Sequence, residues 1–401
     1  MAKVRGKWRI RATEAGRVLI RGIGFVLLAS LVVPSFGVFA ILASVCLVAL
    51  VAGFVLRPRI EISGNLPDRV VAGQTAPLTY CLRNIGRLPA YSLSLRFRTL
   101  PDAIEPVGHA QAPSRLGPGE TAEITLSIRP RRRGSYRIGL PVCESSFPFN
   151  LFCLGVVQRQ QETLLVLPAF SWLRIPMQYV SRHVNASNLR PAGRIGGSPE
   201  YIGSRPYASG DSPRRIDVRA WARLAAPATK EYDDDLDDYA AFVLDTRIPL
   251  GRAKAKSGEI EELEAVVSLC ASVAYTIHRD CLIDLLLAGP DLHEFGAWPK
   301  TVRLERIHEV LAGVEPSPEY AIDRIGPLLE DRLTEISEIV FILLHWDDMY
   351  RHLVEWADRA GCHVTVVVIG EPDPEVLAQE WAGEIGFVSA QDVLAGRVEQ
   401  L

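Results

Sequence analysis

The chain has 401 residues, which is enough for two or three domains rather than one small core. Its 44 Lys and Arg residues nearly balance its 47 Asp and Glu residues, so it lacks the basic excess of most nucleic-acid-binding proteins, and we expect no nucleic-acid partner. The 48 % hydrophobic and 23 % charged content excludes a disordered chain.

The first predicted element is a membrane anchor. From Gly22 to Leu56 the chain carries no Asp, Glu, Lys or Arg, and Pro34 interrupts this run because proline removes a helical hydrogen bond. We expect a transmembrane hairpin over residues 18–56, with helices at about 18–33 and 36–56. Basic residues on both sides of the run favour the cytoplasm. The sequence therefore predicts a multi-pass cell-membrane protein that contacts lipid through this hairpin, with residues 1–17 and the soluble domains in the cytoplasm.

Two other interpretations of the apolar run stay open. A single tilted span would place the later residues outside the cell, and a cleaved signal peptide would have a shorter apolar core. The seven cysteines contain no CxxC pair, so they form neither a disulfide framework nor a zinc motif. Cysteine usage thus favours the cytoplasm, with the thiols as small buried hydrophobic groups.

Residues 57–168 alternate between polar and apolar side chains with a period of two. Short alternating stretches separated by turn residues are typical of an antiparallel β-sandwich. We expect strands at Pro77–Leu82, Ser92–Phe97, Glu123–Ile128, Tyr136–Leu140 and Thr163–Leu167.

Residues 169–239 form an Arg/Gly/Pro-rich linking element. Arginine at this density suits pairing with carboxylates, either between the flanking domains or on a partner protein. The segment lacks a phosphate-binding GxxxxGK[ST] motif. A helix is predicted to begin at Pro213, with Asp211 or Ser212 as the N-cap. The candidate interaction or interdomain residues are Arg205, Tyr207, Gly210, Asp211, Arg214, Arg215, Asp217, Arg219 and Arg223.

Residues 240–401 alternate between apolar strands and amphipathic helices, which predicts a parallel sheet covered on both faces. The expected strands are 240–245, 282–287, 339–344, 364–369 and 386–388, and the expected helices are 259–279, 302–312, 322–333, 349–360 and a short last one. Asp245, Asp347 and Asp348 follow strands, where sites in such sheets lie. Their carboxylates would suit Mg²⁺, although an Asp at a strand end is often a helix cap.

The central element resembles a known family. Gly203-Ser204-Arg205-Pro206-Tyr207, Gly210-Asp211, Arg214-Arg215-Ile216-Asp217 and Ala222-Arg223 look like the bacterial family called domain of unknown function 58. The resemblance covers nearly the whole chain, with Val218 where the family usually has Trp. It implies a C-terminal domain similar to the von Willebrand factor type A fold, and a partnership with MoxR-type AAA+ ATPases.

The type A fold often carries a metal site that begins Asp-x-Ser-x-Ser. Here the matching residues are Asp245-Thr246-Arg247-Ile248-Pro249, so both serines are absent. Arg247 opposes a divalent cation electrostatically. We therefore expect no cofactor, and keep Asp245, Thr246 and Asp347 as a degenerate candidate site for Mg²⁺.

The fold class expected from these features is α+β multidomain, with a transmembrane hairpin, an antiparallel β-sandwich and an α/β, Rossmann-like type A domain. The expected function is a membrane-anchored, non-enzymatic protein-interaction module that works with a MoxR-type ATPase in the assembly or maturation of other proteins. The alternatives are a metal-dependent adhesion protein that faces the exterior and a metal-dependent hydrolase that uses Asp245 and Asp347.

Overall fold

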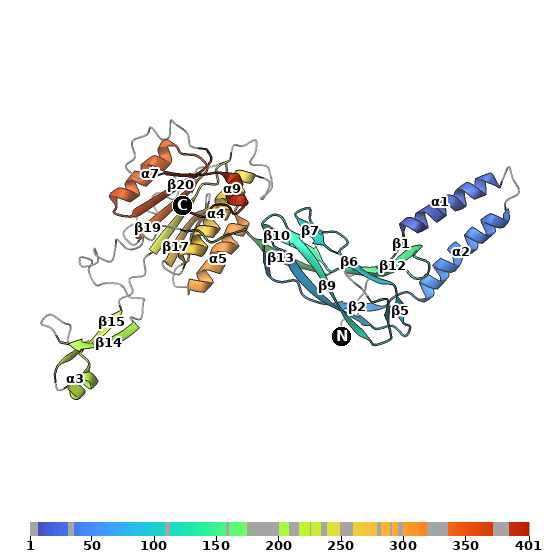
Figure 1. The fold of residues 1–401 in the computed structure, drawn as a ribbon, viewed down its shortest axis with the longest axis horizontal. Helices are drawn as coiled ribbons and strands as arrows, with labels where there is room; N and C mark the ends of the chain where they lie inside the picture. The colour runs from blue at the N-terminus through green and yellow to red at the C-terminus, as the bar shows by residue number, and fades with distance from the viewer. Residues whose placement is uncertain are drawn as a thin grey trace. The chain divides into compact units, whose positions relative to one another are not determined.

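The computed structural model divides the chain into two compact units, Met1–Ala169 with Glu309–Gly313, and Phe170–His308 with Val314–Leu401. The structure describes residues 7–30, 36–108, 113–157, 160–174, 200–207, 216–224, 226–233, 239–248, 260–278, 282–288, 291–295, 300–318, 336–371 and 385–400. Within these ranges the chain is mixed α+β, with several antiparallel sheets and one largely parallel sheet (Figure 1).

The first unit is built from short strands in four sheets. The sheet orders are β1 (Lys7–Ala12), β12 (Phe152–Val157), β11 (Val142–Ser145), β6 (Leu93–Arg96); β2 (Ile60–Ser63), β4 (Ala76–Asn84), β9 (Thr121–Pro130), β7 (Ile104–Val107); β10 (Gly134–Gly139), β13 (Gln161–Leu167), β3 (Arg69–Val71); and β5 (Ala90–Tyr91), β8 (Arg115–Leu116). Every pair is antiparallel except β3 with β13. The five strands predicted for this region are confirmed.

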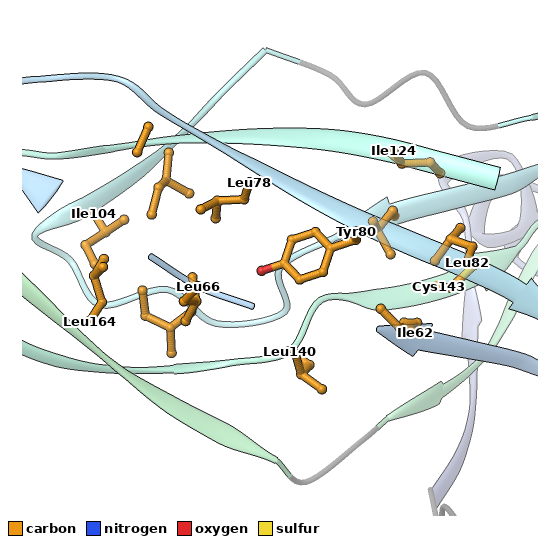
Figure 2. Packing of buried hydrophobic residues seen from close by; sticks show 14 of the residues in the cluster. Ile62, Leu66, Leu78, Tyr80, Leu82, Ile104, Ile124, Leu140, Cys143 and Leu164 are labelled. Carbon is orange, nitrogen blue, oxygen red and sulfur yellow. The ribbon is translucent and has the colours of Figure 1, made fainter. Parts of the chain in front are cut away.

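Alternating side chains from these sheets form the core of the first unit. Along β4, Leu78, Tyr80 and Leu82 are buried while the residues between them are largely exposed. Figure 2 shows the Tyr80 ring among Leu66, Leu78 and other aliphatic side chains of this cluster. Burial raises the pKa of the Tyr80 phenol to about 12, with a smaller contribution from the charge of Glu162.

The expected pair of transmembrane helices is corrected by the structure. Two helices are present and pack together (Figure 1), α1 (Glu14–Ala29) and α2 (Phe36–Val55). Among the described helices only α2, with 20 residues and a mean hydropathy of 2.8, is long and apolar enough to cross a membrane. Helix α1 begins four residues before the predicted start because the Thr13 hydroxyl accepts a hydrogen bond from the Gly16 amide, which adds Glu14 and Arg17 to the helix.

The second unit contains the predicted parallel sheet. Its order is β18 (Asp291–Glu294), β17 (Leu282–Ala288), β16 (Tyr239–Leu244), β19 (Glu338–Leu343), β20 (His363–Ile369), β21 (Ile385–Val388), parallel throughout except for the edge strand β18. The described helices of this region are α4 (Glu261–Ile277), α5 (Lys300–Gly313), α7 (Asp348–Arg359) and α9 (Ala390–Leu394). The predicted helix at 322–333 lies outside the described residues.

Both faces of this sheet are covered. Along β19, Ile339, Phe341 and Leu343 join the cluster that includes Tyr350 and Val354 of α7. The intervening residues of β19 are also buried, and α4 contacts β16, β19 and β20. Continuous apolar strands are the sequence signature of a sheet buried in this way.

The linking element contains a pair of strands that no sequence pattern predicted, together with a helix. Strands β14 (Glu200–Pro206) and β15 (Ala228–Asp233) pair antiparallel with a register shift between Tyr201 and Gly203. A short helix, α3 (Val218–Leu224), precedes β15. These three elements are called the β14–α3–β15 element below.

Candidate functional site

Asp217 fixes the start of α3. One carboxylate oxygen accepts hydrogen bonds from the amides of Arg219, at 3.0 Å, and Ala220, at 3.1 Å. The other oxygen accepts one from the Ser204 hydroxyl at 2.6 Å, which ties the helix to β14. These bonds, that of Ser204 first, hold the pKa of Asp217 below its ordinary value. Asp217 is therefore a buried N-cap that joins α3 to the strand pair.

The predicted helix start at Pro213 is thus wrong. Asp217 caps the helix directly by accepting the amides of Arg219 and Ala220, so the helix begins at Val218.

Large side chains of α3 point into solvent. Val218 is 70 % exposed and Trp221 is 42 % exposed. Arg219 and Arg223 are also exposed, so the helix shows apolar and cationic groups together. Tyr207, exposed at the end of β14, donates its backbone amide to Pro227 just before β15. We call these five residues the α3 surface.

The structure describes part of the predicted set. Tyr207, Arg219 and Arg223 belong to the α3 surface, Asp217 is the cap beneath it, and Arg205 pairs in register with Thr229. Gly210, Asp211, Arg214 and Arg215 lie outside the described residues. The family motif includes Ser204, but no sequence pattern predicted its bond to Asp217 or a role for Trp221. An exposed Trp one turn after a capping Asp is the signal that could have indicated this surface.

The second candidate site lies at the carboxyl ends of β16 and β19. These strands are neighbours where the strand order reverses direction, which is the position of the ligand crevice in doubly wound sheets. Asp245 follows β16 and is almost completely buried. Its carboxylate accepts the amides of Arg247, at 2.9 Å, and Leu344, at 3.3 Å, so it bridges the two strand ends.

Burial dominates the electrostatics of Asp245. It raises the pKa of the carboxyl, while the Arg247 amide, a hydrogen bond from the Tyr350 hydroxyl and the Arg247 charge act in the opposite direction. Tyr350 comes from α7, and its own phenol pKa is raised by burial and by Asp245. Tyr350 was missed by the sequence analysis because it lies inside a helix, where its contact with Asp245 depends on tertiary packing.

Arg247 and Asp347, which follow these two strands, form an ion pair with 3.3 Å between Nη2 and a carboxylate oxygen. Asp347 also caps α7 by accepting the Tyr350 amide at 3.1 Å, and Asp348 pairs with Arg351 within that helix. The Thr246 hydroxyl is buried without a hydrogen-bond partner in the described part of the chain. No group of three His, Cys, Asp or Glu side chains suited to a metal ion occurs among those residues. The donor set at this crevice does not fit Mg²⁺, since a guanidinium neutralises the second carboxylate.

Comparisons with known proteins give limited information. No protein-family model and no curated protein matches the chain. Among solved structures, a CARDB domain from Pyrococcus furiosus is 20 % identical, covers 27 % of this chain and 94 % of its own, and has a TM-score of 0.18. The alpha-2-macroglobulin of E. coli is 17 % identical over 33 % of this chain and 10 % of its own, with a TM-score of 0.22. The VesB protease of Vibrio cholerae is 9 % identical over 27 % and 32 %, with a TM-score of 0.20. Scores this low carry no argument about function.

Proposed function

We propose that the chain is a membrane-anchored, non-enzymatic protein-interaction module that belongs to the domain of unknown function 58 family. It works with a MoxR-type AAA+ ATPase in the assembly or maturation of other proteins. The α3 surface is its docking site, and the C-terminal unit has the von Willebrand factor type A fold. This proposal rests on the exposed apolar and cationic side chains of α3, a helix that Asp217 holds in place.

The composition of the α3 surface supports docking of a protein. Trp, Tyr and Arg are the residue types most enriched among energetically dominant interface residues. Exposed aliphatic and aromatic groups on a fixed helix lose little conformational freedom when a partner covers them. Truncating one such Trp in an interface costs about 2–4 kcal/mol of binding free energy.

The charge of the α3 surface selects the kind of partner. Arg219 and Arg223 lie one turn apart, and α3 carries no acidic residue. Planar guanidinium groups pair with carboxylates in two-bond geometry. The matching partner surface is therefore acidic, with an apolar pocket for Trp221.

The anchor of the proposed module is α2, and α1 packs beside it. Pairing of β1 with β12 over Lys7–Ala12 supports a same-side arrangement, because residues before α1 and after α2 then belong to one sandwich. The basic residues near both helices favour the cytoplasm for that side. A cleaved signal peptide would remove β1 from its sheet.

The ion pair between Arg247 and Asp347 supports a binding role for the strand-end crevice over a metal-dependent one. A hydrolase or adhesion site would use Asp245 and Asp347 as ligands for a cation. Here the Arg247 guanidinium forms an ion pair with the Asp347 carboxylate. The Asp245 carboxylate accepts hydrogen bonds from two backbone amides and from the Tyr350 hydroxyl.

The experiment is capture of the ATPase by the full chain. The chain in lipid nanodiscs is incubated with a MoxR-type ATPase of its own organism, with and without ATP, as parent, Trp221→Ala and Trp172→Ala. Trp172 is an exposed control elsewhere in the second unit. We expect ATP-dependent capture that Trp221→Ala reduces at least tenfold and Trp172→Ala leaves unchanged. If the parent chain captured no ATPase, the proposed partnership with the ATPase would be rejected. If both variants changed capture equally, the α3 surface would be rejected as the docking site.

A further inference from the structure

Helix α1 is seated directly on the connector between β11 and β12. The Thr13 amide and hydroxyl both donate to the Leu151 carbonyl at 3.0 Å. Gly16, in the first turn of α1, lies so close that a Cβ would fall 2.0 Å from the same carbonyl oxygen. Only glycine fits there, so the beginning of α1 is fixed against this connector.

Helix α2 ends against the same part of the sandwich. A Cβ on Gly53 would lie 2.9 Å from a methyl group of Leu154 and 3.5 Å from the Phe147 carbonyl oxygen. Ala49 is buried with Leu151 and Leu154 in one cluster. The start of α1 and the end of α2 therefore leave the sandwich from one end.

A second loop completes this end. The Ile85 amide donates to the carbonyl of Arg59, four residues after α2, at 2.9 Å. The loop that begins at Ile85 joins the connector through the Ser146 amide, which donates to Ser92, and through the rings of Tyr91 and Phe147 at 5.0 Å. We call residues 84–92 and 146–151 the helix-proximal end.

This end exposes large apolar side chains in its loops. Ile85 is 59 % exposed, Leu88 48 % and Phe149 64 %. Phe149 has a φ of 62°, which is uncommon for a bulky residue, and the turn is held by the Asn150 amide donating to Ser146 at 3.0 Å. Exposed Arg59 and Arg87 stand beside these loops. Apolar tips interleaved with arginine match the boundary between lipid headgroups and acyl chains.

We propose that the helix-proximal end lies in the headgroup layer of the membrane. Ile85, Leu88 and Phe149 insert among the lipids there, while Arg59 and Arg87 contact anionic headgroups. This inference rests on the proposed anchoring through α2, whose last turns pack against this end of the sandwich. It assigns a lipid-binding surface to the sandwich itself and fixes the orientation of the sandwich on the bilayer.

The strand β4 supplies an internal control. It runs from Ala76 to Asn84, so the turn residue Gln74 and the loop residue Ile85 are separated by about 30 Å at the rise of an extended strand. Gln74 is exposed like Ile85, but it belongs to the opposite end of the same strand. It should remain in water when Ile85 is in lipid.

The test uses nitroxide labels on the full chain in vesicles of phosphatidylethanolamine and phosphatidylglycerol. Single cysteines replace Ile85, Phe149, Gln74 and, within α2, Val48, and the signal of the unmodified chain is subtracted. We expect the labels at 48, 85 and 149 to favour collisions with oxygen over a nickel chelate, and the label at 74 to favour the chelate. Water-exposed labels at 85 and 149 beside a lipid-exposed label at 48 would overturn this inference and leave the anchor intact. A water-exposed label at 48 would overturn both.

Discussion

The guanidinium of Arg247 lies 3.3 Å from the carboxylate of Asp347, and this ion pair joins the segments that follow β16 and β19. Both side chains are about three-quarters buried. A cationic side chain thus stands where a metal-dependent site in such a sheet would need an open, negatively charged set of ligands.

Removing this ion pair should weaken the second unit without exposing a metal site. For Arg247→Ala we expect a loss of roughly 1 kcal/mol in unfolding free energy, seen as a Tm lower by about 2–4 °C. Asp347→Asn keeps the α7 cap and should lose a similar amount, and the double variant should lose little more. Millimolar Mg²⁺ should leave the parent's Tm unchanged, and a rise of several degrees would contradict this description of the crevice.

The bond from Tyr350 to Asp245 should make stability depend on pH. Burial raises the pKa of the Asp245 carboxyl in the folded state, so its protonated form stabilises the fold. That stabilisation is complete below the ordinary carboxyl pKa and is lost as pH rises through the folded-state pKa. Tyr350→Phe removes a donor to the carboxylate and should raise that pKa further. We expect a loss of about 1–3 kcal/mol near pH 7 and a smaller loss near pH 4, measured by urea unfolding. An equal loss at both pH values would indicate a packing role alone.

Asp217 should control the integrity of the β14–α3–β15 element. Asp217→Ala removes three hydrogen bonds, so we expect several-fold faster cleavage by a protease between Glu200 and Asp233. Because its folded pKa is lowered, the carboxylate stabilises the element above the ordinary carboxyl pKa and stops doing so as pH falls through the folded pKa. Cleavage sites are identified by mass spectrometry, with the exposed residue change Glu123→Ala as the control. Equal cleavage rates in the two variants would show that Asp217 does not hold this element together.

The strand β1 should remain part of the mature protein. Arg11 is opposite Cys153 in the register of β1 and β12, so Arg11→Cys should form a disulfide with the native thiol in membranes treated with a mild oxidant. Glu144 loses one ion pair but keeps its bonds with Arg96, so the sheet should persist. Arg11→Cys combined with Cys153→Ser is the control. A mature chain that lacks residues 7–12, or an absent crosslink, would show that β1 is not paired in the membrane.

Sequence patterns predicted the elements whose side chains repeat regularly. Polar and apolar residues alternate in β4 because one face of that strand is buried. The apolar runs of β16 and β19 are continuous because both faces of those strands are buried. Strand β1 was missed because its lysine and arginines, adjacent to an apolar run, were interpreted as a basic flank. Its strand character comes from pairing with β12, far away in the chain.

The candidate sites were predictable only where the chemistry is local. The strand-end position of Asp245 follows from the sheet, but its contacts with Leu344 and Tyr350 depend on packing between distant segments. In the linking element two capping signals compete, Asp211-Ser212-Pro213 and Asp217, and the sequence does not rank them. The bond from Ser204 favours Asp217 because it adds a tertiary contact to the local cap.

The central claim is that the α3 surface binds an acidic partner, and charge reversal tests it most directly. The dissociation constant for the MoxR-type ATPase is measured with ATP for the nanodisc-bound chain as parent, Arg219→Glu/Arg223→Glu, and Arg83→Glu/Arg137→Glu. The last variant carries the same charge change on exposed sandwich strands. The account predicts at least tenfold weaker binding for the first pair and less than twofold change for the second. Binding by Arg219→Glu/Arg223→Glu within twofold of the parent would contradict it.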